Sequence, residues 1–103
     1  MATGNVKPTL VLSICLASAD NWSVSANSYD YKDINITGLD GRTPIGVVGI
    51  DVFNASSSGS NANNIAINRF QFLNNGKVRV GLRNVASSAA KVKCVANVLC
   101  SNV

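Results

Sequence analysis

The acidic side chains that could carry out acid–base chemistry are all aspartates, because the 103-residue chain contains neither histidine nor glutamate. They are Asp20, Asp30, Asp33, Asp40 and Asp51. A Ser-His-Asp or Cys-His site needs an imidazole to take the proton of the nucleophile, so hydrolases of these types are excluded. A glycosidase needs two carboxylates in fixed geometry, whereas these aspartates fall mostly in predicted turns such as Leu39–Gly41. We therefore expect no catalytic residue and no enzymatic activity.

The other groups that could bind a metal or a cofactor are three cysteines and the glycines. Cys15, Cys94 and Cys100 lack the C-x-x-C spacing of a zinc site, and the glycines match neither G-x-G-x-x-G nor a Walker A motif. We expect no metal and no cofactor. Cys94 and Cys100 lie on one predicted strand at about 3.3 Å per residue, which separates them by roughly 20 Å and puts them beyond disulfide reach. The sequence therefore predicts buried free thiols.

Aromatic side chains provide the candidate ligand site. Trp22, Tyr29 and Tyr31 cluster in a polar, turn-rich segment, where exposed rings could stack on a sugar face, and Asn27 lies between them. We predict a glycan contact at these four residues. A single tryptophan at the start of a strand is also commonly a core residue, so burial of Trp22 is the alternative. The three phenylalanines lie in apolar strand contexts and are expected in the core.

Alternation of apolar and polar residues between turn signals predicts an all-β chain. The length fits one domain over residues 1–103, and the 47% hydrophobic content can support a packed core. About seven to eight short strands without a helical period indicate an antiparallel β-sandwich or jelly roll. Asn75-Gly76 predicts a tight hairpin turn, and Ala55–Asn63 reads as a flexible loop. The predicted strands are Thr9–Leu16, Trp22–Ser28, Tyr31–Thr37, Ile45–Phe53, Asn64–Leu73, Lys77–Asn84 and Lys91–Cys100.

The N-terminal segment could be either a strand or a secretory signal. Lys7, the apolar run Leu10–Leu16 and the sequence Ala17-Ser18-Ala19 imitate a signal peptide with its cleavage site. The run alternates, however, with Leu10, Leu12, Ile14 and Leu16 predicted on the core face and Val11 and Cys15 on the other. We therefore predict a strand and no cleavable signal. No run reaches the roughly 18 apolar residues of a membrane span, so we expect a soluble protein without membrane insertion.

The last two predicted strands can be aligned as a hairpin. With Arg83 opposite Lys91, one face of the hairpin is apolar and predicted to be buried, and it contains Val78, Val80, Leu82, Val92, Cys94 and Ala96. The other face is basic and contains Lys77, Arg79, Arg83, Lys91 and Lys93. This face could bind an anion or nucleic acid, or it could be a solvated surface that keeps the domain soluble. The sequence favours the solvated surface, and no nucleic-acid partner is expected, because the aromatic residues do not interleave with these charges.

Several segments together resemble a known class of viral domain. They are Pro44-Ile45-Gly46-Val47-Val48-Gly49-Ile50, the Ser/Asn-rich loop, Asn75-Gly76-Lys77-Val78 through Arg83-Asn84, and the terminal Val98-Leu99-Cys100. Over roughly residues 22–100 the chain resembles the C-terminal tip or knob domains of tail and minor structural proteins of phages and prophages of gut Firmicutes. The resemblance implies a β-sandwich knob, often trimeric, at a fibre tip, and hence a location in the virion tail.

Two functions are consistent with these features. The first is a non-enzymatic tail structural or receptor-binding domain that contacts a host-surface glycan or protein. The alternative is a secreted bacterial carbohydrate-binding or adhesin domain, which would be extracellular. We further expect a homo-oligomer, most simply a trimer, because apolar residues remain opposite the predicted core face, with a monomer as the alternative. These outward residues are Val11, Cys15, Ile45, Val47, Val95 and Leu99.

Overall fold

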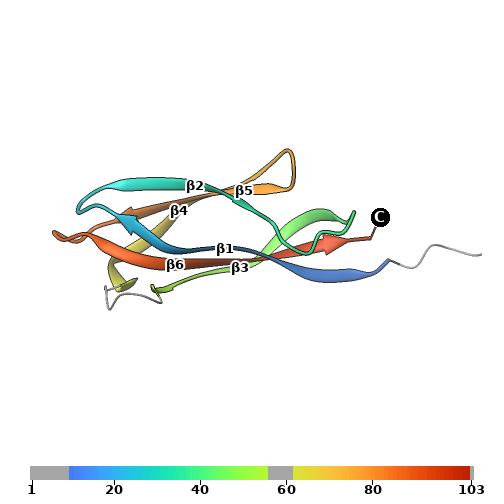
Figure 1. Cartoon of the computed structure of the whole chain (residues 1–103), viewed down its shortest axis with the longest axis horizontal. Helices are drawn as coiled ribbons and strands as arrows, with labels where there is room; N and C mark the ends of the chain where they lie inside the picture. The colour runs from blue at the N-terminus through green and yellow to red at the C-terminus, as the bar shows by residue number, and fades with distance from the viewer. Residues whose placement is uncertain (1–9, 56–61, 103) are drawn as a thin grey trace, which may run out of the picture.

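The computed structural model describes residues 10–55 and 62–102, and over these residues it is an all-β protein. The strands form two antiparallel three-stranded sheets that pack as a sandwich (Figure 1). The predicted all-β sandwich is therefore confirmed. The six strands are β1 (Leu12–Val24), β2 (Tyr29–Asn35), β3 (Thr43–Asn54), β4 (Ile65–Leu73), β5 (Lys77–Asn84) and β6 (Ala90–Ser101), and one turn of 3₁₀ helix, η2 (Ala62–Asn64), precedes β4.

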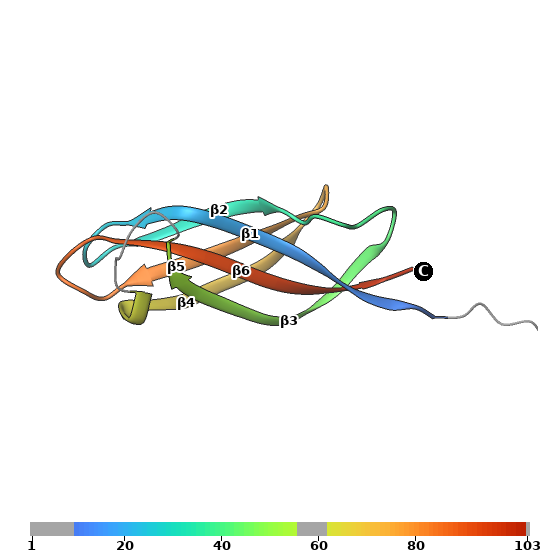
Figure 2. The same ribbon diagram turned by 60° about the horizontal axis from the view of Figure 1, so that its bottom comes forward.

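The chain crosses between the sheets at nearly every connection. Sheet A has the strand order β1-β6-β3, and sheet B has the order β2-β5-β4, so β4–β5 is the one hairpin between consecutive strands (Figure 2). Its turn contains Asn75 and Gly76 with φ angles of 73° and 70°, which confirms the predicted Asn-Gly turn. Most of the predicted loop Ala55–Asn63, like Thr9, lies outside the described residues.

One long strand, β1, replaces the first two predicted strands. Asp20 and Asn21, which lie between the first two predicted strands, form a β-bulge in which both residues stand opposite Lys93 of β6, between the pairs Ala19–Cys94 and Trp22–Val92. Asn21 has a φ of 53°, a left-handed conformation that asparagine tolerates better than most residues. The strand therefore continues through a polar pair that resembles a turn in the sequence, and the described chain has six strands rather than seven.

The prediction of which β1 side chains face the core is wrong by one residue. Cys15 and Ala17 point inward and are buried, whereas Leu12, Ile14 and Leu16 are exposed on the outer face. A shift of one residue moves every side chain of a strand to the other face. The β2–β3 connection lies over the inward side of β1 here, where Cys15 Sγ donates to the Gly38 carbonyl at 3.3 Å.

The apolar faces of β5 and β6 line the core as predicted, but the two strands do not pair. Val80 is completely buried, as are the other apolar residues of both strands that were predicted inside, namely Val78, Leu82, Val92, Cys94 and Ala96. β5 is the central strand of sheet B and β6 is the central strand of sheet A, so their apolar faces meet across the sandwich. The predicted hairpin is therefore wrong, although its inward and outward faces are correct.

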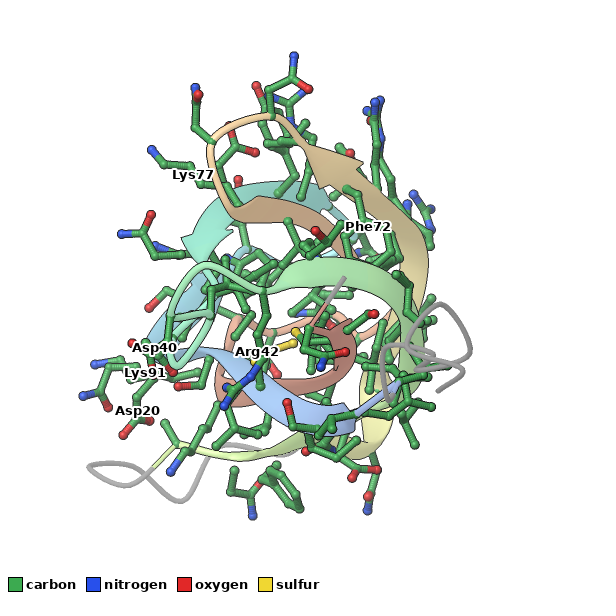
Figure 3. All side chains as sticks on the ribbon, turned by 90° about the vertical axis from the view of Figure 1, so that its right-hand side faces the viewer. Asp20, Asp40, Arg42, Phe72, Lys77 and Lys91 are labelled. Carbon is green, nitrogen blue, oxygen red and sulfur yellow. The ribbon has the colours of Figure 1, made fainter. Side chains whose placement is uncertain are left out.

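The predicted basic face is consequently divided between the two sides of the molecule. Lys77, Arg79 and Arg83 lie on the outer face of sheet B, whereas Lys91 and Lys93 lie on the outer face of sheet A. Figure 3 shows Lys77 at the sheet B side and Lys91 well separated from it, beside sheet A. The cause is the segment after Asn84, which crosses from one sheet to the other instead of turning back beside β5.

A buried asparagine holds this crossing in place. Asn84 is fully buried, and its Nδ2 donates to the carbonyls of Val24 at 3.1 Å and Ser88 at 2.9 Å. Its Oδ1 accepts from the backbone N–H of Ala86 at 2.9 Å. One amide side chain thus satisfies polar backbone groups of β1 and of the β5–β6 connection, which stabilises the packing of the two sheets at this end.

Candidate ligand-binding face

Trp22 belongs to the core and does not reach the surface. The side chain is 1% exposed, and its Nε1–H donates to Asp30 Oδ2 of β2 at 2.8 Å. The ammonium group of Lys32 lies 5.7 Å from the centroid of the ring. The bulge of β1 produces this position, because it restores an inward direction for Trp22 after Asn21. The structure thus removes Trp22 from the predicted glycan contact and assigns it to the packing of β1 against β2.

Asn27 lies in the turn between β1 and β2. Its φ is 50°, and its backbone N–H donates to the Ala86 carbonyl at 2.9 Å, which joins two connections at one end of the sandwich. The side chain is exposed. The structure gives Asn27 a part in the turn and leaves its side chain at the end of the sandwich, beside the start of β2.

Tyr29 and Tyr31 remain exposed and lie together on the outer face of sheet B. They are 41% and 48% exposed, and their ring centroids are 6.3 Å apart with an angle of 37° between the ring planes. The strand period of two places both rings on one face of β2. Across from Tyr31 is Gly81 of β5, where an added Cβ would lie 3.0 Å from Tyr29 Cε1 and 2.9 Å from Arg69 Cβ. Glycine at this position lets the Tyr29 ring lie close to the sheet.

Arg79 connects the tyrosines to a carboxylate. Its guanidinium carbon lies 4.7 Å from the centroid of the Tyr31 ring. Its Nε and Nη2 donate to the two carboxylate oxygens of Asp33 at 2.7 and 2.9 Å, in the bidentate geometry that fixes both side chains. The hydrogen bond from Arg79 lowers the pKa of Asp33, with smaller contributions from the nearby charges of Lys77 and Arg69. The same bond raises the pKa of Arg79.

These residues form one surface, which we name the Tyr–Arg face. It combines an aromatic pair with four cationic side chains and a single carboxylate. Arg69 Nη2 also donates to Gln71 Oε1 at 3.0 Å, so planar polar groups of β4 extend the surface. The members are Tyr29, Tyr31 and Asp33 of β2, Lys77, Arg79 and Arg83 of β5, and Arg69 and Gln71 of β4.

The sequence identified the two tyrosines of this face but missed the residues around them. Arg79 and Asp33 are 46 positions apart, and only the pairing of β2 with β5 brings them together. Alternation along Lys77–Asn84 predicts that Arg79 points outward, yet it does not say which strand lies beside it. The predicted pairing with β6 placed the lysines of β6 there instead of the tyrosines.

The cysteines lie in the core, as predicted. All three are buried free thiols. Burial raises the pKa of Cys94 to about 11, and the carboxylate of Asp51 adds to this shift. Burial also raises the pKa of Cys100 to about 11, with a contribution from its hydrogen bond to Cys15. A thiol with so high a pKa is protonated at neutral pH, which makes it a poor nucleophile.

Within the described ranges there is no pocket and no group of three side chains that could hold a metal ion. Nor do these residues include a helix long and apolar enough to cross a membrane. Comparison with protein-family models, with curated proteins and with solved structures finds no match for this chain.

Proposed function

We propose that this domain is a non-enzymatic attachment module of a phage or prophage tail, and that its Tyr–Arg face contacts a glycan on the host surface. The observation that carries the proposal is the exposed pair of Tyr29 and Tyr31, with Arg79 packed on Tyr31 and held by Asp33. The resemblance of residues 22–100 to tail-tip domains supports the viral context.

The arrangement suits a sugar ligand for physical reasons. A tyrosine ring offers an apolar face for the C–H groups of a pyranose, while its hydroxyl remains available for a hydrogen bond. Planar side chains beside the rings can donate to or accept from sugar hydroxyls, and Gln71 and Asp33 supply both kinds of group. Because the Arg79–Asp33 pair is held in a bidentate geometry, binding would require little ordering of these side chains.

A glycan array tests this proposal. We expect Tyr31→Ala to lower the affinity for the bound glycans at least about tenfold, in line with the loss of one aromatic contact and its hydrogen bond. The control is Val85→Ala, since Val85 is 57% exposed in the β5–β6 connection, outside the Tyr–Arg face and outside the outer face of sheet A. Equal binding by the wild type and a folded Tyr31→Ala variant would show that the Tyr–Arg face is not the glycan site.

A secreted bacterial carbohydrate-binding or adhesin domain is the second candidate, because the same face would serve either protein. Neighbouring genes for tail, holin or lysin proteins support the tail module, whereas a neighbouring glycoside hydrolase or a cell-wall anchor supports the bacterial domain. A host-surface protein is an alternative receptor for the tail module. It would be recognised by binding to protease-sensitive rather than periodate-sensitive material on host cells.

We also propose that the domain self-associates through the outer face of sheet A, as the resemblance to trimeric knobs implies. This face carries Leu12, Ile14 and Leu16 of β1, next to Val95 and Leu99 of β6. Besides these apolar residues, the face carries a positive charge on Lys93 and a negative charge on Asp51, so its charges can pair with the opposite charges of a second copy. Cys15, which the sequence placed outward, is buried and contributes nothing to this face. Several weak glycan sites on one oligomer would raise the avidity.

A further inference from the structure

The Tyr–Arg face carries an excess of positive charge that its own side chains do not neutralise. We infer that its ligand is an anionic glycan, a polysaccharide that bears carboxylate, sulfate or phosphate groups. This inference rests on the proposed glycan-binding function and specifies the class of glycan.

The charges of the face show the imbalance directly. Among the residues that the structure describes, Asp33 is the one carboxylate on the face, and both of its oxygens already accept from Arg79. Arg69 donates to Gln71, and because Gln71 is neutral, this hydrogen bond leaves the positive charge of Arg69 uncompensated. Arg69 and Lys77 are close enough to lower the pKa of Asp33, so the cations lie within electrostatic reach of one another. Like charges gathered on one surface repel, and an anionic ligand relieves that repulsion.

The register interleaves these cations with the tyrosines. Arg83 pairs with Tyr29 across β2 and β5, and Arg69 of β4 pairs with Gly81, the partner of Tyr31. The guanidinium of Arg79 lies over the Tyr31 ring. The sequence alone disfavours anion binding, because along the chain the aromatic residues do not interleave with the basic residues. The pairing of β2 with β5 brings the two kinds of side chain together and removes that objection.

The same geometry favours a glycan over a nucleic acid. Tyr29 and Tyr31 have ring planes inclined by 37°, so they do not form one continuous platform for successive stacked bases. A nucleic acid carries a charge on every nucleotide, whereas this face alternates its cations with the neutral Gln71, the two tyrosines and the paired carboxylate of Asp33. A charged glycan has both anionic groups and hydroxyls. Lys77 and Arg83 can bind the anionic groups, while Gln71 and the tyrosine hydroxyls can form hydrogen bonds with the sugar hydroxyls.

Two pairs of polysaccharides with equal backbones and different charge test the inference. They are polygalacturonate with its fully methyl-esterified form, and dextran sulfate with dextran. A single-stranded oligonucleotide forms a separate arm. We expect the full chain to bind at least one anionic member at least about fivefold more tightly than its neutral partner, with the affinity falling several-fold between 50 and 300 mM NaCl.

Charge-removing variants locate the effect. We expect Lys77→Gln and Arg83→Gln each to weaken binding of the anionic member about two- to fivefold, in the range of one partly exposed charge contact. Lys91→Gln removes the same charge from the end of β6 opposite Ser23, away from the apolar residues of the proposed interface and from the Tyr–Arg face, and should leave binding unchanged. Because two separate positions are tested, a folding defect in one variant still leaves the other to decide.

The remaining outcomes overturn the inference in distinguishable ways. Equal, salt-independent binding of neutral and anionic members would refute the anionic ligand and leave the glycan-binding function in place. Tighter binding of the oligonucleotide than of either polyanionic glycan would point to a nucleic acid instead. A loss in Lys91→Gln as large as in Lys77→Gln would show general charge attraction rather than a site. No binding to these polysaccharides or to any glycan on the array would end the proposed function as well.

Discussion

At the scale of single residues, the chemistry of this chain depends on a few contacts that fix otherwise mobile side chains. Arg79 is the clearest example, since it donates to both oxygens of Asp33 and packs on Tyr31 at the same time. Such a side chain has lost most of its rotamer freedom before any ligand arrives, which is favourable for binding.

The Arg79–Asp33 pair leads to a prediction about pH. The pKa of Asp33 is held below its ordinary value of 3.8. A lowered carboxyl pKa stabilises the fold above the unfolded value, and this contribution is lost as the pH falls through the folded pKa. We expect a carboxyl NMR titration of Asp33 to have its midpoint below 3.8, and Arg79→Gln to raise that midpoint.

Arg83→Gln is the matched control for this titration, because it removes the same charge from β5 without touching the hydrogen bond to Asp33. The midpoint should move less in this variant than in Arg79→Gln. Equal shifts in both variants would mean that general charge, and not the bidentate bond, sets the pKa of Asp33.

The buried thiols lead to a second prediction at this scale. With a pKa of about 11, Cys94 and Cys100 carry a thiolate at pH 8 in only about one molecule in a thousand. We expect both thiols to resist iodoacetamide in the native protein at pH 8 and to react fully after unfolding in guanidinium chloride. Peptide mass spectrometry separates Cys94 from Cys100. Rapid modification of either in the folded state would contradict its burial.

At the scale of strands, local alternation predicted the inward and outward faces of β5 and β6 correctly but not their partners. The period of two is a property of each strand alone, so Val78, Val80 and Leu82 could be placed inside from the sequence. Pairing depends on where the segment after Asn84 leads, and this short run of small residues, Val85 to Ala89, can either turn back or cross to the other sheet. The position of Arg79 beside Tyr31 follows from that choice and was therefore missed.

The same distinction explains the errors on β1. Asp20 and Asn21 have the composition of a turn. A bulge can use the same residue types, because Asn21 takes a left-handed conformation here that residues in many turns also take. The face of Leu12–Leu16 that points to the core was predicted wrongly for another reason. Alternation shows two faces but not which one is covered, and here the β2–β3 connection lies over the face of Cys15 and Ala17, which are buried.

Asn84 provides a prediction about the crossing itself. Replacing it by alanine leaves the carbonyls of Val24 and Ser88 without their donor and the N–H of Ala86 without its acceptor, in a buried environment. We expect Asn84→Ala to lower the free energy of unfolding by about 1–3 kcal/mol. Urea unfolding followed by fluorescence of Trp22 measures the change.

The control for this experiment is Asn35→Ala, at an exposed position of β2, which should change the free energy of unfolding by less than about 0.5 kcal/mol. If the two alanine variants are equally stable, the hydrogen bonds of Asn84 do not hold the crossing, and the stability of this end of the sandwich comes from the apolar packing alone.

At the scale of the whole molecule, the two outer faces of the sandwich differ in character. Sheet B presents the polar and basic Tyr–Arg face, whereas sheet A presents the apolar residues of β1 and β6. Ile14 and Leu16 are 52% and 44% exposed, and they lie side by side with Leu99 and Asn97 of the neighbouring strand. A sheet face of this kind is typical of an interface, and it leaves sheet B free for a ligand.

Self-association through sheet A is the last prediction. We expect sedimentation equilibrium to give a mass that is a multiple of the 10.7 kDa of one chain, and to show three chains if the resemblance to trimeric knobs holds. Ile14→Lys should shift the protein toward the monomer, because burying an unpaired ammonium in an apolar interface is costly whereas the same group in water is not.

Val85→Lys is the control, since Val85 is exposed in the β5–β6 connection and outside the face. Circular dichroism shows whether both variants keep the strand spectrum, which separates a lost interface from a lost fold. A wild-type mass that stays at one chain over a wide concentration range would refute self-association. An Ile14→Lys variant that associates as strongly as Val85→Lys would move the interface away from β1.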